Sequence, residues 1–467
     1  MKKLMFILSA VAAMSGWAGS PKYVFLFIGD GMSIPQRMTA DEFSRKSGAG
    51  SLAMNAMPFS ATTRTCSSDS LVTDSAAAAT AIACGEKTRN HYSGVDPDGK
   101  PVYSCALAAK NAGKKVGIVS TVTITHATPA GFYAHRKNRG DAYGISIDLA
   151  NSGYDFFAGG GLDVSRRSSE SHPQWAECGE AYEYVRSKGY RIVTTKEEFL
   201  GLKPSDGKIL TKFTNDALDN AIDADGSQPT LSELVSKAIE MLDGENGFFL
   251  MAEGGRIDWA GHANDAATNL RDVLALDEAV KVALAFQDKH PDDTLVVVTG
   301  DHETGGMSMG FAGTGYALYM DRLAHQTMSV GRFEDRLKEA FKANPSMTFD
   351  EAKPLISKAF GFKFEGDRNR EPMVLTREER STITKAFEHD SAYAKAQAEN
   401  RRFDGERRYL LGGECRVVLS HKCGIGWSSG QHTAMPVLTT AKGPGAERFV
   451  GFIENTDIAK IFKSFYK

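Results

Sequence analysis

The sequence predicts a doubly wound α/β fold, in which a mainly parallel central sheet carries helices on both faces. Short apolar runs recur along the chain, and most of them end in small or polar residues such as Gly, Asp or Thr. Uninterrupted runs of this length are typical of strands buried on both faces of a parallel sheet. Helical patterns separate the runs, which favours strand–helix–strand units. Because ligands of such folds bind beyond the carboxyl ends of the strands, the polar residues after each run form the candidate site.

The individual elements follow from the same patterns. The predicted strands cover residues 23–28, 116–119, 156–157, 248–251, 295–298 and 437–440. The predicted helices cover residues 105–112, 231–242, 270–289 and 457–465. The strand segments are short and continuously apolar, whereas the helical segments repeat apolar residues at helical spacing.

Residues 307–422 differ from the rest, because they are rich in charge and mostly helical in pattern. Helices are expected within them at 333–342, 349–360 and 377–387. Candidate site residues both precede and follow this segment, so its two ends must return near the site. We therefore divide the chain into a signal peptide (1–18), the first part of a main domain (19–306), an insertion that forms a lid or an interface (307–422), and the C-terminal part of the main domain (423–467).

The first residues have the pattern of an export signal. Lys2 and Lys3 precede an apolar run at 4–14, and small residues lead to a cleavage point near Gly19. This run is too short to span a bilayer and is typical of a secretory signal peptide. We therefore expect a periplasmic or secreted protein. No later segment approaches 18 uninterrupted apolar residues, so no membrane span is expected.

Composition narrows the possible partners. The chain has 55 Lys and Arg against 58 Asp and Glu, a formal net charge of −3. Nucleic-acid-binding proteins carry clustered basic surface, so no nucleic-acid partner is expected. Export permits disulfides, but six cysteines allow 15 pairings. Only Cys415 and Cys423 are close enough in sequence to suggest a local disulfide loop.

The segment VTDSAAAATA, residues 72–81, is the most informative of the chain. Alanine is the best helix former, so Ser75 is expected at or just before the first turn of a helix. A hydroxyl there faces free backbone N–H groups and the positive end of the helix dipole, which together can hold a phosphate. An isolated serine in this position would be only a helix cap. The metal-binding residue types elsewhere in the chain favour the phosphate site.

Those residue types follow several predicted strands. Asp258 and His262 are four residues apart and can face one ion from a single helical turn. The full set of candidate ligands is Asp30, Glu253, Asp258, His262, Asp301, His302 and His432. Carboxylates and imidazoles without thiolates suit zinc, with an oxygen-rich corner for magnesium.

Such a site fits phosphoryl transfer. Two metal ions about 4 Å apart stabilise both the attacking and the leaving oxygen of an in-line displacement. An arginine should hold two phosphate oxygens in a bidentate way. Arg136 and Arg139 are both candidates, and the residue pattern alone does not choose between them.

Five motifs in this order resemble the alkaline phosphatase family: GDGM, VTDSAAAATA, HATPAGFYAH, EGGRIDWAGH and VTGDHETGG. The resemblance covers residues from about 22 to 306 and again from about 431 onward. It implies an enzyme that hydrolyses small phosphate monoesters and releases inorganic phosphate. It also allows a homodimer, because family members carry interface-forming segments where this chain has residues 307–422.

The resemblance also implies residue roles. Ser75 matches the nucleophile that becomes phosphoserine and also contacts zinc, Asp74 is its neighbouring helper, and Arg139 matches the phosphate-gripping arginine. The implied cofactors are two zinc ions and one magnesium ion. The implied ligands are Asp258, His262 and His432 for the first zinc, Asp30, Asp301 and His302 for the second, and Asp30, Thr128 and Glu253 for magnesium.

Two positions depart from a single family pattern. His126 stands where some members have Asp, and Trp259 stands where some have Lys or His. Both are expected around the magnesium and the phosphate. Two alternative functions are a phosphodiesterase or phosphonate hydrolase of the same superfamily, and a non-catalytic phosphate- or metal-binding protein. The first typically uses a Thr or Cys-derived nucleophile and lacks the magnesium corner, and the second should lack a nucleophile or ligand.

Overall fold

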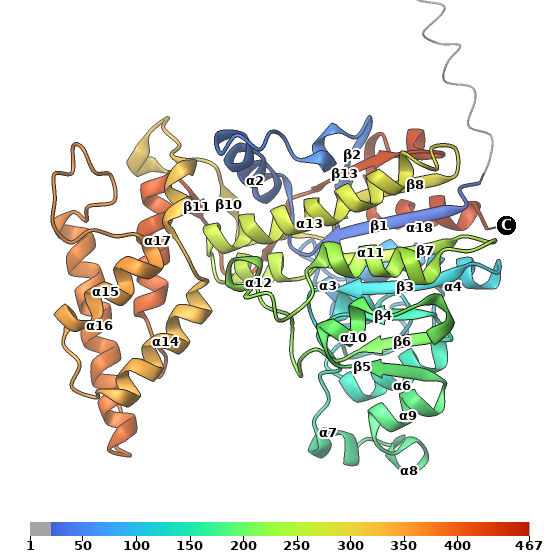
Figure 1. Cartoon of the computed structure of the whole chain (residues 1–467), viewed down its shortest axis with the longest axis horizontal. Helices are drawn as coiled ribbons and strands as arrows, with labels where there is room; N and C mark the ends of the chain where they lie inside the picture. The colour runs from blue at the N-terminus through green and yellow to red at the C-terminus, as the bar shows by residue number, and fades with distance from the viewer. Residues whose placement is uncertain (1–19, 467) are drawn as a thin grey trace, which may run out of the picture.

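The computed structural model describes residues 20–466, so the signal peptide predicted at 1–18 lies outside the described residues. A ten-stranded sheet runs through the molecule in the order β14-β2-β13-β8-β1-β7-β3-β4-β6-β5 (Figure 1). Its strands are β1 (Tyr23–Gly29), β2 (Phe59–Arg64), β3 (Lys115–Ser120), β4 (Phe156–Ala158), β5 (Tyr190–Val193), β6 (Lys208–Thr211), β7 (Phe248–Gly254), β8 (Thr294–Gly300), β13 (Val437–Lys442) and β14 (Gly451–Glu454). Only β13 runs antiparallel to its neighbours, so the prediction of a mainly parallel sheet is confirmed.

The register of the central strands aligns their carboxyl ends. β1 lies between β7 and β8, and all residues of the three strands are buried. Gly29 pairs with Gly254 on one side and with Gly300 on the other. The residues that end or follow these strands, Asp30, Glu253 and Asp301, therefore lie at one edge of the sheet.

Helices cover both faces of the sheet, as predicted. Alternate side chains of β1 enter two separate cores: Phe25 and Phe27 lie in one, Leu26 and Ile28 in the other. The first core is covered by α2 (Ile34–Lys46), α11 (Leu231–Leu242) and α13 (Ala266–Gln287). The second is covered by α3 (Ser75–Cys84), α4 (Cys105–Asn111), α6 (Ala142–Ser152), α9 (Ala181–Ser187) and α18 (Asn455–Ser464).

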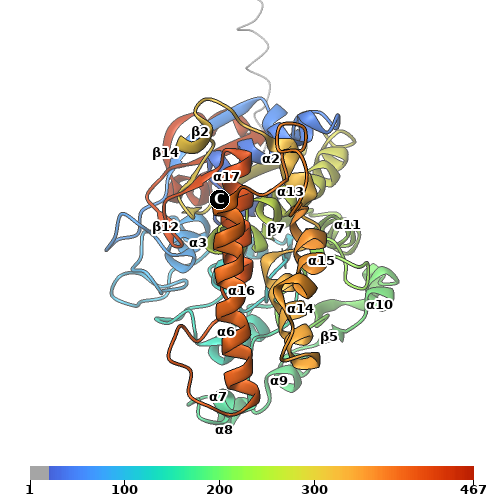
Figure 2. The same ribbon diagram turned by 90° about the vertical axis from the view of Figure 1, so that its left-hand side faces the viewer.

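The charged segment forms a helical lobe at one end of the molecule, seen face-on in Figure 2. Its helices are α14 (Val330–Ala343), α15 (Phe349–Phe360), α16 (Arg377–Ala398) and α17 (Leu411–Cys423). The first three match predicted helices. α17 was not predicted, because its two glycines and its buried residues on several sides give no single apolar face. The domain boundaries at 306 and 422 stay a prediction.

Two short ribbons return the chain to the sheet. β10 (Met307–Ser308) pairs with β11 (Gly426–Trp427) at the two ends of the lobe. β9 (Glu303–Thr304) pairs with β12 (His432–Thr433), so His432 lies opposite Thr304. Residues more than a hundred positions apart in sequence are thereby joined at the edge of the sheet.

The suggested loop disulfide is wrong. All six cysteines are free thiols. Cys415 and Cys423 are both buried in the single helix α17. Eight residues of helix separate them by about 12 Å, which is well beyond the Cα separation of a disulfide.

Between residues 20 and 466, no helix combines the length and the apolar character needed to cross a bilayer.

Several strands were missed by the sequence patterns. β2 (FSATTR) is polar and partly exposed, and β14 is an exposed edge strand. A strand with one solvent-exposed face alternates apolar and polar residues and therefore does not form a continuous apolar run.

Asp272 of α13 is an unusual buried carboxyl. Asp272 is only 6% exposed to solvent. One carboxylate oxygen accepts a hydrogen bond from Ala221 N at 2.7 Å, and Oδ2 has no hydrogen-bond partner in the described part of the chain. Burial raises the pKa of Asp272 to about 7, although the Ala221 hydrogen bond and the Arg256 charge oppose this rise.

Asp272→Asn should therefore stabilise the protein at alkaline pH. A raised pKa means that the folded state keeps a proton that the unfolded state has lost, so stability falls as pH rises from about 4 to 7. The asparagine removes this loss. We expect the gain in unfolding free energy to be roughly 2–3 kcal/mol larger at pH 8 than at pH 5. Urea unfolding at both pH values measures it. Glu278→Gln, at an exposed carboxyl of the same helix, is the control and should show no such difference.

Candidate active site

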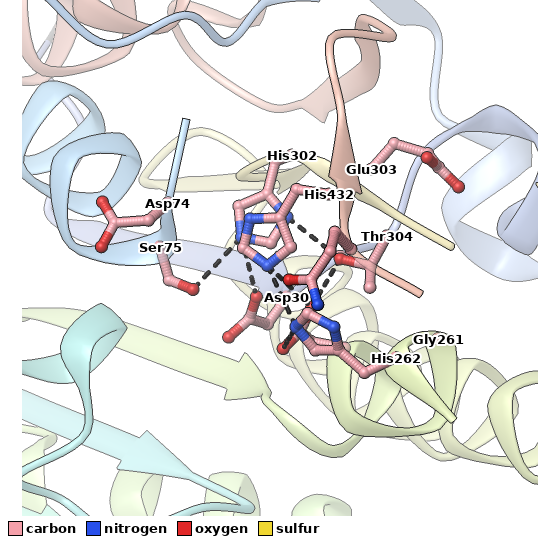
Figure 3. Close-up of polar contacts among 12 residues, drawn as sticks. Asp30, Asp74, Ser75, Gly261, His262, His302, Glu303, Thr304 and His432 are labelled. Carbon is pink, nitrogen blue, oxygen red and sulfur yellow. Dashed lines mark hydrogen bonds and ion pairs between the residues drawn. The ribbon is translucent and has the colours of Figure 1, made fainter. Parts of the chain in front are cut away.

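Ser75 is the first residue of α3, and it is buried. Asp74 is the helix cap, because its Oδ1 accepts a hydrogen bond from Ala77 N at 3.0 Å. The capping role that the sequence left open for Ser75 is thus filled by its neighbour. The Ser75 hydroxyl points instead toward His302, and its Oγ lies 3.2 Å from His302 Nε2 (Figure 3). A hydroxyl at a helix N-terminus facing an imidazole is well placed to act on an anion.

The first candidate metal cluster contains Asp258, His262 and His432. Asp258 and His262 come from α12 (Arg256–His262), which follows β7 directly. His262 Nε2 lies 3.4 Å from Asp258 Oδ2 and 3.2 Å from His432 Nε2. The Nδ1 atoms of the two histidines lie 2.8 Å from Gly430 O and 2.9 Å from Thr73 O. A ring nitrogen beside a carbonyl carries the proton, so both Nε2 atoms keep a free lone pair for a metal.

The second cluster contains Asp30, Asp258 and His302, and His302 is fully buried. His302 Nε2 lies 3.4 Å from both Asp30 Oδ1 and Asp301 Oδ2. Neither of these carboxylate oxygens has a hydrogen-bond partner within residues 20–466. His302 Nδ1 lies 3.2 Å from Thr304 Oγ1, which in turn donates to Asp258. Thr304 therefore orients ligands of both clusters, and sequence analysis missed it.

The third cluster contains Asp30, His126 and Glu253. Thr128 Oγ1 donates to Asp30 Oδ2 at 3.4 Å, so this threonine is also beside the cluster. Glu253 Oε2 accepts a hydrogen bond from Ser120, whereas Glu253 Oε1 and His126 Nδ1 have no partner among the described residues. The sequence placed His126 only near a metal, but its geometry is that of a potential ligand.

Burial perturbs the charges of these groups. It raises the pKa of Glu253 from its ordinary value to about 7. It raises the pKa values of Asp30 and Asp301 well above the usual range, and neighbouring carboxylates add to both shifts. Burial lowers the pKa of His126 to about 3 and the pKa of His302 well below its usual value. Each of the three carboxylates has one oxygen without a hydrogen-bond partner among the described residues. Neutral imidazoles beside such mutually repelling carboxylates suit divalent cations, so the residues present fit a metal site.

The two candidate arginines have different surroundings. Arg136 is held by Asp148, with Nε at 2.9 Å and Nη2 at 2.6 Å from its carboxylate oxygens. Arg139 lies beside the metal clusters, with Nη1 3.1 Å from Asp74 Oδ2 and Nη2 3.4 Å from His126 Nε2. Arg139 is therefore the arginine at the candidate site.

Trp259 lies on α12 next to Asp258 and is half-buried. Its ring centroid is 6.1 Å from that of His126. The guanidinium of Arg256 lies 4.7 Å from the indole centroid, a cation–π distance. The sequence placed Trp259 near the phosphate, but it gave no sign of the Arg256 contact, which joins residues three apart on one helix.

Comparisons with known proteins identify the family to which the chain is related. Residues 21–467 match the family model described as alkaline phosphatase. Alkaline phosphatase 4 of Bacillus subtilis (strain 168) is 33% identical over 395 residues, which are 84% of this chain and 76% of that protein. The structure of a cold-active alkaline phosphatase from the psychrophile Shewanella sp. has a TM-score of 0.78 and 26% identity, and the match covers 95% of this chain and 100% of that chain.

A third similar protein is a mutant of the alkaline phosphatase from the Antarctic bacterium TAB5, solved with Mg bound in its M3 site. It has a TM-score of 0.65 and 27% identity, and the match covers 96% of this chain and 98% of that chain. The family model covers residues 21–467, and the match to the Shewanella structure covers 95% of the chain. The chain therefore belongs to the alkaline phosphatase family of enzymes.

Proposed function

We propose that this enzyme hydrolyses phosphate monoesters through a phosphoserine intermediate on Ser75. The observation that carries the proposal is the position of Ser75 Oγ, which is buried at a helix N-terminus and 3.2 Å from His302 Nε2. His302 belongs to the second cluster, so the hydroxyl lies beside candidate ligands. A phosphodiesterase or phosphonate hydrolase is less well supported, because the chain combines a serine at the start of α3 with Thr128, Glu253 and Arg139.

In the proposed reaction, Ser75 Oγ attacks phosphorus in line, and the bond from phosphorus to the ester oxygen breaks. The serine proton passes to solvent water, and the departing alkoxide takes one proton from solvent and leaves as the alcohol. A water molecule then attacks phosphoserine, frees Ser75 and releases inorganic phosphate. Arg139 holds two non-bridging oxygens through its guanidinium. Asp74 keeps that guanidinium oriented by its 3.1 Å contact with Nη1.

We propose zinc for the two clusters around His262 and His302, and magnesium for the cluster around Glu253. When bound, these ions would stabilise negative charge on the attacking and leaving oxygens and favour the ionised serine. Zinc is supported by the free Nε2 lone pairs. Magnesium is supported by the oxygen-rich set of Asp30, Thr128 and Glu253, and by the Mg that a similar protein binds in its M3 site.

Steady-state hydrolysis of an aryl phosphate monoester and an aryl diester, each with and without a chelator, tests the proposed function. We expect the monoester to be strongly preferred and the chelator to abolish its hydrolysis. Preference for the diester would favour the rival reaction. Metal-dependent phosphate binding without any turnover would favour the non-catalytic alternative.

We also propose that the protein is exported to the periplasm or secreted, and that residues 307–422 form an insertion in a catalytic domain made of 19–306 and 423–467. N-terminal sequencing of the mature protein tests cleavage near Gly19. A homodimer is a further proposal, and the mass of the protein in solution, with and without residues 310–420, tests it.

Trp259→Lys should strengthen inhibition by inorganic phosphate. A lysine near the phosphate adds a charge-assisted contact, and product release can limit turnover. Trp259 offers no such charge. We expect the inhibition constant for phosphate to fall about tenfold, corresponding to ~1.4 kcal/mol. Trp259→Gln, which is polar but uncharged, is the control. An unchanged constant in the lysine variant would contradict this role.

His126→Asp should reduce the dependence of activity on added magnesium. The burial that lowers the pKa of His126 to about 3 keeps its imidazole neutral, whereas an aspartate adds a negative charge to the third cluster. After dialysis, the unsubstituted enzyme should gain activity on adding magnesium, and the variant should need several-fold less. His126→Asn is the control, because asparagine has the shape of aspartate without its negative charge. Identical magnesium titrations of all three proteins would contradict this expectation.

A further inference from the structure

A pocket of about 180 Å³ lies beside the candidate site, between α12 and the first turn of α14. Trp259 and Ala263 line it from α12, Asn220 lines it from a loop, and Val330 and Gly331 line it from α14. This volume is more than ten times the ~10–15 Å³ that one water molecule requires. The pocket therefore has room for an organic group.

The pocket begins one side chain away from the proposed phosphate site. Trp259 directly follows Asp258 of the first cluster. Its ring centroid lies 6.1 Å from that of His126, and His126 Nε2 lies 3.4 Å from Arg139 Nη2. A substrate held by Arg139 can thus extend its alcohol part along the indole into the pocket.

The wall on the insertion side is fixed. Val330 N donates to Asp265 Oδ2 at 2.9 Å, and Gln326 Nε2 donates to Asp265 Oδ1 at 2.8 Å. Ser329 N donates to Asp223 Oδ1 at 2.9 Å. These three hydrogen bonds hold the start of α14 against the main domain. A ligand that enters the pocket therefore loses little binding free energy to the ordering of this segment.

Arg256 lines the pocket from the side of α12. The Arg256 guanidinium lies 4.7 Å from the Trp259 ring centroid, which holds the indole in place. The charged side chains of the lining are one positive and one negative, Arg256 and Asp265. The pocket therefore offers no excess positive charge to an anionic group. An indole face favours flat rings, which stack on it in offset or edge-to-face geometry.

We propose that this pocket is a leaving-group subsite that selects phosphate monoesters whose alcohol carries a flat, uncharged ring. Trp259 is its specificity-determining residue, and Val330 and Gly331 of the insertion form its outer wall. The inference rests on the proposed phosphatase function and names the substrate class of that site.

Benzyl phosphate and butyl phosphate test the subsite, because both release a primary alcohol and differ mainly in the ring. The unsubstituted enzyme should have the higher kcat/KM for benzyl phosphate. Trp259→Ala should lower the ratio of the two kcat/KM values about tenfold. If Trp259→Ala leaves the ratio of kcat/KM for benzyl phosphate to kcat/KM for butyl phosphate unchanged, the proposal is overturned. This holds even if the variant hydrolyses both esters more slowly.

Gly331→Leu provides an independent test from the insertion side. A Cβ at Gly331 meets only Ser329 Oγ, at 3.8 Å, so a side chain fits there and extends from the pocket wall. We expect a several-fold higher KM for benzyl phosphate and an unchanged KM for butyl phosphate. Glu339→Leu, at an exposed position of the same helix, should change neither value.

The outcomes separate the subsite from the function on which it rests. Equal effects of Gly331→Leu on both esters, or none, would overturn the subsite and leave the phosphatase function standing. Failure of the unsubstituted, metal-loaded enzyme to hydrolyse either ester would overturn both.

Discussion

Ser75→Ala should lower kcat for phosphate monoesters on the order of 10⁴-fold while leaving metal and phosphate binding intact. The hydroxyl is the only group of the protein proposed to bond to phosphorus, whereas Arg139 and the three clusters remain in place. The surrounding alanines of α3 are buried and need no rearrangement to accept another alanine. Steady-state kinetics gives kcat, and calorimetry with inorganic phosphate gives the binding constant.

Ser104→Ala is the matched control. Ser104 is also buried and caps a helix, α4, by accepting from Leu107 N at 3.1 Å, but it lies in no metal cluster. Its loss should cost about 1 kcal/mol of stability and leave kcat unchanged. Acid quenching of the unsubstituted enzyme with labelled substrate should place phosphate on Ser75. Label on another residue, or full activity of Ser75→Ala, would exclude the proposed nucleophile.

The strands that the sequence predicts best are those buried on both faces of the sheet. β1, β7 and β8 read as unbroken apolar runs because no residue in them meets water. The polar β2 and the helix α17 escaped detection because neither presents the regular pattern of a single buried face. Their places are decided by tertiary packing, which overrides local preference.

Some residues of the candidate site can be identified from the sequence, and others are brought to the site only by tertiary contacts. Asp30, Glu253 and Asp301 could be identified because each ends or follows a strand, and parallel strands bring their carboxyl ends to one edge. His432 is brought to that edge by the pairing of β12 with β9, which no local pattern reveals. The choice of Arg139 over Arg136 depends on the ion pair between Arg136 and Asp148, a tertiary contact of 2.6 Å.

Removing the metals should abolish activity and destabilise the protein, and the destabilisation should grow with pH. In the metal-free protein, burial raises the pKa of Glu253 from 4.5 to about 7. Between these values the folded state keeps a proton that the unfolded state has lost, so stability falls as pH rises. This one group contributes a loss of ~3 kcal/mol by pH 7. The pKa values of Asp30 and Asp301 are shifted in the same direction and add to it.

Bound divalent cations would reverse this trend, because they pair with the ionised carboxylates. We therefore expect the Tm difference between metal-loaded and chelator-treated protein to be much larger at pH 8 than at pH 5. Differential scanning calorimetry at both pH values measures it, and restored activity on adding zinc and magnesium checks that the loss is reversible. Glu253→Gln should flatten the pH dependence of the chelator-treated form, since it removes one buried carboxyl. A Tm difference that is equal at both pH values, or that shrinks as pH rises, would mean that these carboxylates do not face bound cations, and the metal assignment would fail with them.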